Sequence, residues 1–273
     1  MNDTMPMVGA ALASRHLEDH ADWLISGQRD LEIKDFSSPR VLDDHCNDTV
    51  HHINAVMDGH TGRVGIHGPL WNFRQTAFDP KIREIAVLRF RQALDAAAAI
   101  GATHMVVHSP FEFLGSPARL DRPTMGPYDM FTLVHEALAE TVEHAESIGC
   151  VLVIENVYDR LPTMLTGLVE SFESEYVRQS VDSGHAYINH MQGAPPPDFW
   201  ARTAGEMLAH VHLQDTDGYG DRHWCIGDGD INWRTLFRAI AKTETNPRLL
   251  LELKTHTDIP RAMAYLQQNG LAC

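Results

Sequence analysis

The chain has 273 residues and a formal net charge of −15, from 22 Lys and Arg against 37 Asp and Glu. Its hydrophobic fraction of 44% is ample for a buried core, which excludes global disorder, and its acidity argues against partners bound through their phosphates, such as nucleic acid. The unusual feature is the 17 histidines, because His is the side chain most often used for metal binding and proton transfer.

The start of the chain and its cysteines predict a cytoplasmic protein without a membrane partner. Asp3 precedes the first apolar stretch, and Pro6 interrupts this stretch, which is too short to span a bilayer and lacks a basic region before it. Four widely spaced cysteines in a long chain favour reduced thiols over a disulfide framework. These cysteines are Cys46, Cys150, Cys225 and Cys273.

Short apolar runs typical of strands alternate with longer helical patterns along the whole sequence. Strands are predicted at residues 7–13, 31–34, 63–67, 104–108, 151–155, 180–182, 209–213 and 249–252. Helices are predicted at about residues 17–27, 42–57, 81–100, 128–148, 162–172, 197–208, 233–241 and 258–268. Gly101 and Gly149 precede strands, where the C-cap of a helix belongs.

This alternation predicts an α/β fold, a (β/α)8 TIM barrel that forms a single domain over residues 1–273. A doubly wound open sheet is the alternative architecture. That fold usually carries a Gly-rich phosphate loop after an early strand, and neither GxGxxG nor a P-loop motif occurs here. The long loops at residues 110–127 and 215–232 follow strands, as the active-site loops of a barrel do.

Six consecutive predicted strands end in a residue that can bind a metal. These residues are His67, His108, Glu155, Asp182, His212 and Glu252. They lie one βα unit apart, so a barrel would bring all six to its C-terminal rim, where catalysis takes place. A carboxylate that ends an apolar run, as Glu155 does, is costly to bury unpaired, and a bound cation would offset the cost. A salt-bridged strand end or a partner of a ligand is the alternative: it is favoured for any one position, whereas six positions in register favour a metal site.

A second group of candidate ligands follows the sixth and seventh strands. His185 lies one turn beyond Asp182, and Asp221 and His223 lie in the loop after His212. Two imidazoles and a carboxylate can form a further metal site. The alternative is a solvated acidic loop with incidental histidines.

Two other histidines lie on strands. His104 opens its strand at the opposite end of the barrel, which favours a structural role. His210 shares a face with His212 one layer deeper, and we expect it to be a core histidine or a partner of a ligand.

In their order and spacing, these motifs resemble the xylose isomerase-like TIM-barrel superfamily. This group includes sugar isomerases and epimerases, related lyases and endonuclease IV-type AP endonucleases. The resemblance extends over residues 8–266. It rests on IEN at 154–156, VDSGHA at 181–186, HVHLQD at 210–215, DRHxxxGxG at 221–229, DINW at 230–233 and LELK at 251–254.

The resemblance implies a divalent metal bound by four residues, namely Glu155, Asp182, His212 and Glu252. It also implies that Glu155 and Glu252 form the acid–base pair that moves a proton next to a substrate carbonyl, which agrees with the chemistry of paired carboxylates. In the endonuclease IV branch, His67, His108 and Glu155 match a further metal position, and His185, Asp221 and His223 match a third. One to three ions of Mn, Zn, Mg, Fe or Co are expected, although the histidines argue against a purely oxygen-bound Mg.

The loops after the ligand strands supply candidate substrate contacts. The rings of Trp71, Phe111 and Trp224 could line a pocket for a sugar, or could instead pack in a lid or a subunit contact. Arg222 and Lys254 could bind an anionic group of the substrate, and a solvated rim lysine is the alternative for Lys254.

The sequence therefore favours a metal-dependent isomerase or epimerase of a sugar, keto-sugar or polyol derivative. One alternative is a multinuclear phosphodiesterase of the endonuclease IV type. Another is a lyase, dehydratase or non-catalytic relative on the same barrel. The net charge of −15 ranks a small carbohydrate above DNA as the partner. The oligomeric state stays open, a homo-oligomer included.

Overall fold

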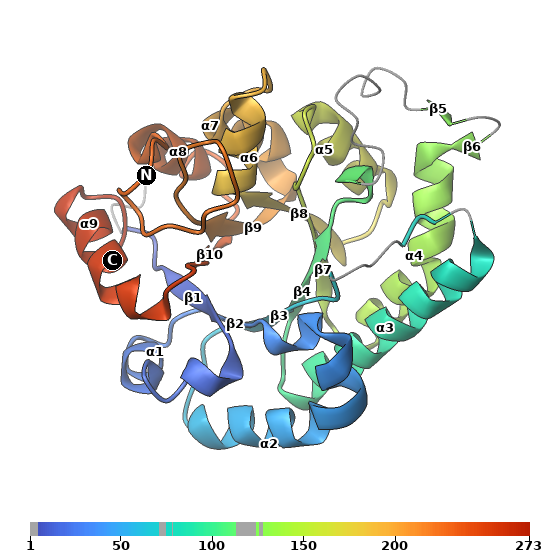
Figure 1. Cartoon of the computed structure of the whole chain (residues 1–273), viewed down its shortest axis with the longest axis horizontal. Coiled ribbons are helices and arrows are strands. Elements are labelled where there is room, and N and C mark those ends of the chain that lie inside the picture. Colours follow the sequence, from blue (N-terminus) through green and yellow to red (C-terminus); the bar gives the residue numbers. More distant parts are fainter. Residues whose placement is uncertain (1–4, 71–74, 78, 113–123, 126–127) are drawn as a thin grey trace.

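Eight parallel strands close into a barrel in the computed structural model, which describes residues 5–70, 75–77, 79–112, 124–125 and 128–273 (Figure 1). The barrel strands are β1 (Gly9–Leu12), β2 (Leu31–Ile33), β3 (Val64–His67), β4 (His104–His108), β7 (Val151–Glu155), β8 (Val177–Asp182), β9 (Leu208–Leu213) and β10 (Arg248–Leu251). Neighbours in the ring follow the chain order, and β10 pairs with β1 to close it. The predicted TIM barrel is confirmed.

Helices surround the ring of strands (Figure 1). They are α1 (Ala21–Gly27), α2 (Cys46–Val56), α3 (Pro80–Ala99), α4 (Met130–Ser147), α5 (Pro162–Ser171), α6 (Ser183–His190), α7 (Pro197–Ala204), α8 (Trp233–Ile240) and α9 (Ile259–Gln268). Helix α3 begins at Pro80 because the Asp79 carboxylate accepts the Lys81 N–H and because proline needs no partner at the first helical position. None of the helices within these described ranges is long and apolar enough to cross a membrane.

The structure differs from the sequence prediction mainly at short elements. Strand β8 begins at Val177, three residues before the predicted start, the first predicted helix begins later, at Ala21, and a 3-10 turn replaces the end of the sixth. A small antiparallel pair, β5 (Thr124–Met125) and β6 (Tyr128–Asp129), precedes α4. Helix α6 was not predicted: its sequence has glycine in the first turn, and its start depends on a side-chain cap from Asp182.

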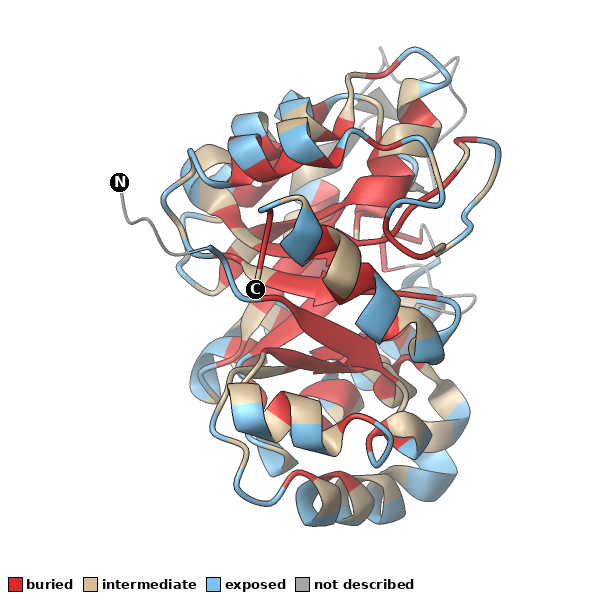
Figure 2. Cartoon of the chain, turned by 90° about the vertical axis from the view of Figure 1, so that its left-hand side faces the viewer, coloured by how far each residue is buried: buried red, intermediate tan, exposed pale blue. Residues whose placement is uncertain are grey.

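The strands are buried on both faces, while the outer faces of the helices are exposed (Figure 2). Apolar side chains such as Leu31 and Ile33 of β2 belong to the main core. Between them, Glu32 points to the opposite face because side chains alternate along a strand. Glu32 has 0% exposure, as have His104, His210 and His212. The barrel therefore encloses polar groups, and these lie beneath the rim that carries the predicted ligands.

Candidate metal centre

The structure gathers the nine predicted ligands at or just beyond the C-terminal ends of the barrel strands. Six are buried, namely His67, Glu155, Asp182, His185, His212 and Glu252, and the other three are partly or largely exposed. Strand register accounts for part of this convergence. His108 is paired with Glu155 across β4 and β7, and Asp182 is paired with His212 across β8 and β9.

His212 is the centre of the group. Its Nδ1 lies 2.5 Å from Oε2 of Glu155 and 3.5 Å from Oε2 of Glu252, so carboxylates from two separate strand ends approach one imidazole nitrogen. All three side chains are at most 9% exposed. Lys34, just after β2, lies 3.5 Å from Oε1 of Glu252 through its Nζ.

Asp182 uses its two carboxylate oxygens differently. Oδ1 accepts the backbone N–H of His185 at 2.7 Å and so caps α6. Oδ2 is buried without a hydrogen-bond partner. A buried, unpartnered carboxylate oxygen is unfavourable in an apolar setting, and a bound cation would satisfy it.

Two further groups lie on either side of this centre. In the first, the rings of His67 and His108 are 5.1 Å apart, and Nε2 of His108 lies 3.8 Å from Oε1 of Glu155. The three potential ligand atoms of this group lie within 4.8 Å of one another. The first group therefore shares Glu155 with the centre.

The second group contains His185, Asp221 and His223. Oδ2 of Asp221 lies 3.5 Å from Nε2 of His185, and its Oδ1 lies 3.1 Å from Nε2 of His223. Their potential ligand atoms also lie within 4.8 Å of one another. The structure thus brings together the two three-residue sets, and in the four-residue set it places Glu155 and Glu252 against His212 and Asp182 near Glu155.

Hydrogen bonds select which nitrogen of each histidine faces these carboxylates. Nδ1 of His67 donates to the carbonyl of Gly68, Nδ1 of His185 to that of Asn156, and Nδ1 of His223 to that of Glu252. Carbonyl oxygens only accept, so each Nδ1 carries a proton and leaves Nε2 for a metal. In His212 the roles are reversed, because Nε2 donates to Glu32 at 2.9 Å. This arrangement is typical of metal-binding histidines.

The charges at the rim shift the pKa values of its groups. Burial opposes protonation of His223, yet the carboxylates of Glu252 and Asp221 raise its pKa to about 9. Nearby carboxylates likewise raise the pKa values of His185 and His212 well above the usual range. Burial raises the pKa of Asp182 to about 6. Protonated histidines therefore supply the positive charge that balances the carboxylates when no metal is bound.

The donor set fits a divalent transition metal. It combines imidazole nitrogens with carboxylate oxygens, which suits Zn, Mn, Fe or Co better than Mg. The unpartnered oxygen of Asp182 and the preset histidine nitrogens point to the same conclusion. These observations leave the identity of the metal open.

Several contributors to the site were not singled out from the sequence. Glu32 and Lys34 contact His212 and Glu252, respectively. Gln214 links two ligand groups, because its Nε2 donates to Asp182 at 3.3 Å and to Asp221 at 2.9 Å. Gly184 allows this close approach, since a Cβ there would lie 2.3 Å from Cδ of Gln214.

The loop that carries Asp221 and His223 is organised by a buried carboxylate. Asp215 accepts backbone N–H groups from Gly227 and Ile231 and the indole N–H of Trp233. The motifs HVHLQD and DINW therefore contact each other in the structure, because Asp215 ends the first motif and Trp233 ends the second. The loop is therefore held in place by hydrogen bonds within its own sequence.

The residues predicted to contact a substrate differ in their exposure and in their contacts. Phe111 is 3% exposed and packs near Phe131 in the core. Arg222 pairs with Asp217 at 3.0 Å and lies over the ring of Trp224. The side chain of Lys254 is exposed. Trp71 lies outside the described residues.

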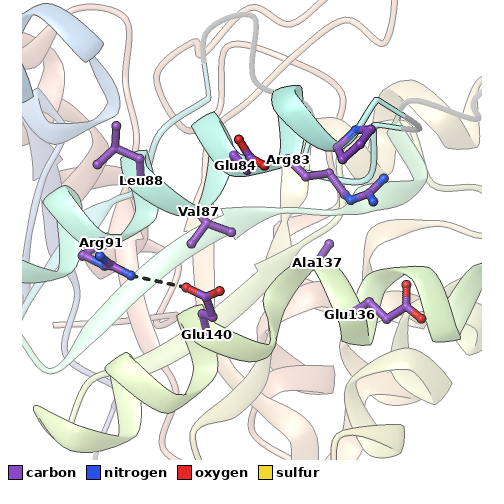
Figure 3. Close-up of a pocket in the computed structure, with 9 residues that line it drawn as sticks. Arg83, Glu84, Val87, Leu88, Arg91, Glu136, Ala137 and Glu140 are labelled. Carbon is purple, nitrogen blue, oxygen red and sulfur yellow. Dashed lines mark hydrogen bonds and ion pairs between the residues drawn. The ribbon is translucent and has the colours of Figure 1, made fainter.

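A surface groove of about 390 Å³ lies on the outside of the barrel, between α3 and α4 (Figure 3). Charged side chains such as Arg91 and Glu140 line it and form an ion pair at 3.3 Å. The lining contains none of the predicted ligands. This groove is therefore separate from the candidate metal centre.

The fold and the candidate ligand set define a TIM barrel with candidate metal sites at its rim, and sequence comparison identifies the family. The pattern of the xylose isomerase-like TIM barrel family matches residues 38–269, so the chain belongs to this family. Fructoselysine 3-epimerase from Escherichia coli O157:H7 is 25% identical over 194 residues, which cover 68% of this chain and 66% of that protein.

Solved structures agree with this assignment. A Thermus thermophilus protein, TTHB071, soaked with ZnCl2, is 25% identical and has a TM-score of 0.72 over 96% of each chain. A D-tagatose 3-epimerase-like protein is 20% identical and has a TM-score of 0.74 over 96% of each chain. The predicted family resemblance is confirmed, and sugar epimerases are among the distant relatives.

Proposed function

We propose that the protein is a metal-dependent epimerase or isomerase of a sugar, keto-sugar or related polyol. The observation that carries this proposal is the position of Glu155 and Glu252, whose buried carboxylates both contact Nδ1 of His212. These residues come from β7 and from the end of β10, three strands apart around the barrel. Two such carboxylates can remove a proton from one face of a substrate carbon and return one to the other face.

The surroundings of Glu252 keep its carboxylate ionised. Burial by itself would raise its pKa, but His212, His223 and Lys34 hold that pKa well below its usual range. Glu155 is similar, because His212 lowers its pKa to about 2 despite burial. Both residues are therefore ionised at neutral pH, which is the protonation state that a general base requires, although the neighbouring positive charges reduce their basicity.

A divalent metal bound by Glu155, Asp182, His212 and Glu252 would polarise a substrate carbonyl and stabilise the negative charge that proton removal creates. Asp182 is held for this role by its bond to the start of α6. Lys34 lies at the same rim and can bind a substrate oxygen next to Glu252. We further propose that Arg222, Lys254 and the rings of Trp71 and Trp224 contribute to substrate binding, whereas Phe111 packs in the core.

The test is incorporation of solvent deuterium into a panel of ketoses by the metal-loaded protein. We expect exchange at a carbon next to the carbonyl, with at least about 100-fold slower exchange in Glu155→Gln and Glu252→Gln, the usual range for loss of a general acid or base. Glu140→Gln on the exposed face of α4 is the matched control. Wild-type rates in both site variants would rule out the proposed pair. No exchange into any ketose would favour a lyase, a dehydratase or a non-catalytic relative.

One observation favours a second candidate function, a multinuclear phosphodiesterase of the endonuclease IV type. His185, Asp221 and His223 converge into a group that an epimerase with one metal does not require. Several metals could activate water and bind a phosphate. Chelator-sensitive incision of an abasic DNA duplex at physiological salt would support this function, whereas the net charge of −15 argues against it.

A further inference from the structure

A second histidine–carboxylate cluster lies inside the barrel, one layer below the candidate metal centre. This interior cluster consists of Glu32, His104 and His210, all with 0% exposure. Oε2 of Glu32 lies 3.1 Å from Nε2 of His210 and 3.4 Å from Nε2 of His104. Oε1 of Glu32 accepts a hydrogen bond from Nε2 of His212 at 2.9 Å. Glu32 thus connects the interior cluster to the centre.

The local sequence makes room for this cluster. Glu32, Gly65 and His104 are in register across β2, β3 and β4. A Cβ at Gly65 would lie only 1.9 Å from Cε1 of His104, so the imidazole ring occupies the space that a side chain would fill. The missing side chain on β3 lets the His104 ring reach Glu32 across the intervening strand.

The protonation of the cluster is consistent with a buried carboxylate surrounded by N–H donors. Burial lowers the pKa of His104 to about 3 and also lowers the pKa of His210. Both rings are therefore neutral, and their Nε2 atoms lie close to Oε2 of Glu32 without forming a well-aligned hydrogen bond. Nδ1 of His210 then accepts from the Ser180 hydroxyl, whose Oγ lies 2.8 Å away.

These contacts connect five side chains. They run from Glu155 to His212 at 2.5 Å, to Glu32 at 2.9 Å, to His210 at 3.1 Å and to Ser180 at 2.8 Å. Oγ of Ser180 also lies 3.4 Å from Oε2 of Glu155, but its one hydroxyl proton serves a single acceptor at a time. Two of the five, Glu155 and His212, are candidate metal ligands, and Glu32 reaches them through His212.

We propose that Glu32 is a positioning residue of the metal centre. It holds the His212 ring so that Nδ1 faces the other ligands. This inference rests on the proposed metal centre at the rim. Carboxylates that accept the second N–H of a metal-binding histidine typically improve metal affinity about 10- to 100-fold. Glu32 is buried below the site, so it acts through His212 and not on a substrate.

The test compares zinc affinity in Glu32→Gln and wild type, measured on the full-length, metal-free protein by competition with a chromophoric chelator. The amide has the shape of the carboxylate but can turn an N–H toward His212, which favours the wrong tautomer. We expect zinc to bind about 10- to 100-fold more weakly. The visible spectrum of the Co²⁺-loaded variant should change as well, because a residue with only a structural role would leave the metal geometry unchanged. Glu140→Gln is the matched surface control.

Ser180→Ala gives a second and milder test, because it removes the hydrogen-bond partner of His210, which lies against Glu32, and leaves Glu32 in place. We expect a loss of zinc affinity of a few fold, with the circular dichroism spectrum of the wild type. If Glu32→Gln does not fold, Glu32→Asp takes its place, because the shorter side chain withdraws the carboxylate from Nε2 of His212 and should likewise weaken zinc binding. Wild-type affinity in every variant that folds would overturn the positioning role alone. A wild-type protein that binds no zinc would overturn the metal centre and this inference together.

Discussion

The rim and the interior of the barrel use the same residue types in different proportions. At the rim, the carboxylates of Glu155, Asp182, Asp221 and Glu252 converge, and Oδ2 of Asp182 lacks a hydrogen-bond partner. In the interior, one carboxylate, Glu32, contacts three imidazoles. The rim therefore needs added positive charge, from protons or from metals. The interior has three imidazoles for one carboxylate, and the contact of Glu32 with His212 is its well-aligned hydrogen bond, whereas Oε2 of Glu32 only lies close to His104 and His210. The ratio of carboxylates to imidazoles, more than the residue types, distinguishes a ligand site from its support.

The largest expected effect that separates the two regions comes from Asp182→Asn. Zinc affinity should fall by more than about 100-fold, beyond the range for a residue that only supports a ligand. The metal-free variant should be as stable as wild type or more stable, because asparagine also caps a helix and no buried carboxylate remains. In the interior, metal-free Glu32→Gln should be less stable. Chelator competition measures the zinc affinity, and thermal unfolding measures the stability of each metal-free variant. A clear loss of metal-free stability in Asp182→Asn would contradict the proposed difference between the rim and the interior.

Raising the pH from 6.5 to 9 should destabilise the metal-free protein and leave the metal-loaded protein little changed. Although burial opposes it, Glu252 and Asp221 raise the pKa of His223 to about 9 in the folded chain, against 6.5 normally. The folded state holds this proton more tightly, so the stability present below pH 6.5 is lost as the pH rises through 9.

We expect this loss to be on the order of 1–3 kcal/mol by urea denaturation. His185 and His212, whose pKa values are also raised, contribute in the same direction. A bound metal replaces these protons and removes the slope. A metal-free protein that gains stability over this range would show that the rim histidines are not paired with carboxylates in solution.

A substitution on β3 can displace a side chain of the interior cluster without changing any polar residue. In Gly65→Ala, the new Cβ would overlap the ring of His104 and push it away from Glu32, at a cost of about 1–3 kcal/mol in unfolding free energy. The control is Gly167→Ala in α5, where a Cβ meets its nearest neighbour at 3.9 Å and a helical alanine stabilises by about 0.5–1 kcal/mol. Equal stability of the two variants would mean that His104 is not confined as described.

Much of the rim could be predicted from the sequence, because a βα repeat brings successive strand ends to one face. The positions of His67, His108 and Glu155 at strand ends follow from this regularity alone. His185 was harder, since its position depends on α6, a helix that begins with a cap and not with an apolar pattern.

The interior was less predictable, because its contacts join residues far apart in the chain. Glu32 and His212 are 180 residues apart, and only the closed barrel makes them neighbours. The available signal was an acidic residue between Leu31 and Ile33, which alternation turns toward the inside of the barrel. His104 was predicted at the opposite end of the barrel. It does begin β4, but the space above Gly65 lets its ring reach Glu32.

The most direct test of the central claim, that the rim binds metal, is elemental analysis of metal per chain in wild type, Asp182→Asn and His185→Ala. Differences between these proteins are informative, because a separate group, His16, Asp19 and His256, would bind metal equally in all three. We predict bound divalent metal in wild type and less of it in each variant. Metal-free wild type, or the same metal content in all three proteins, would contradict the account.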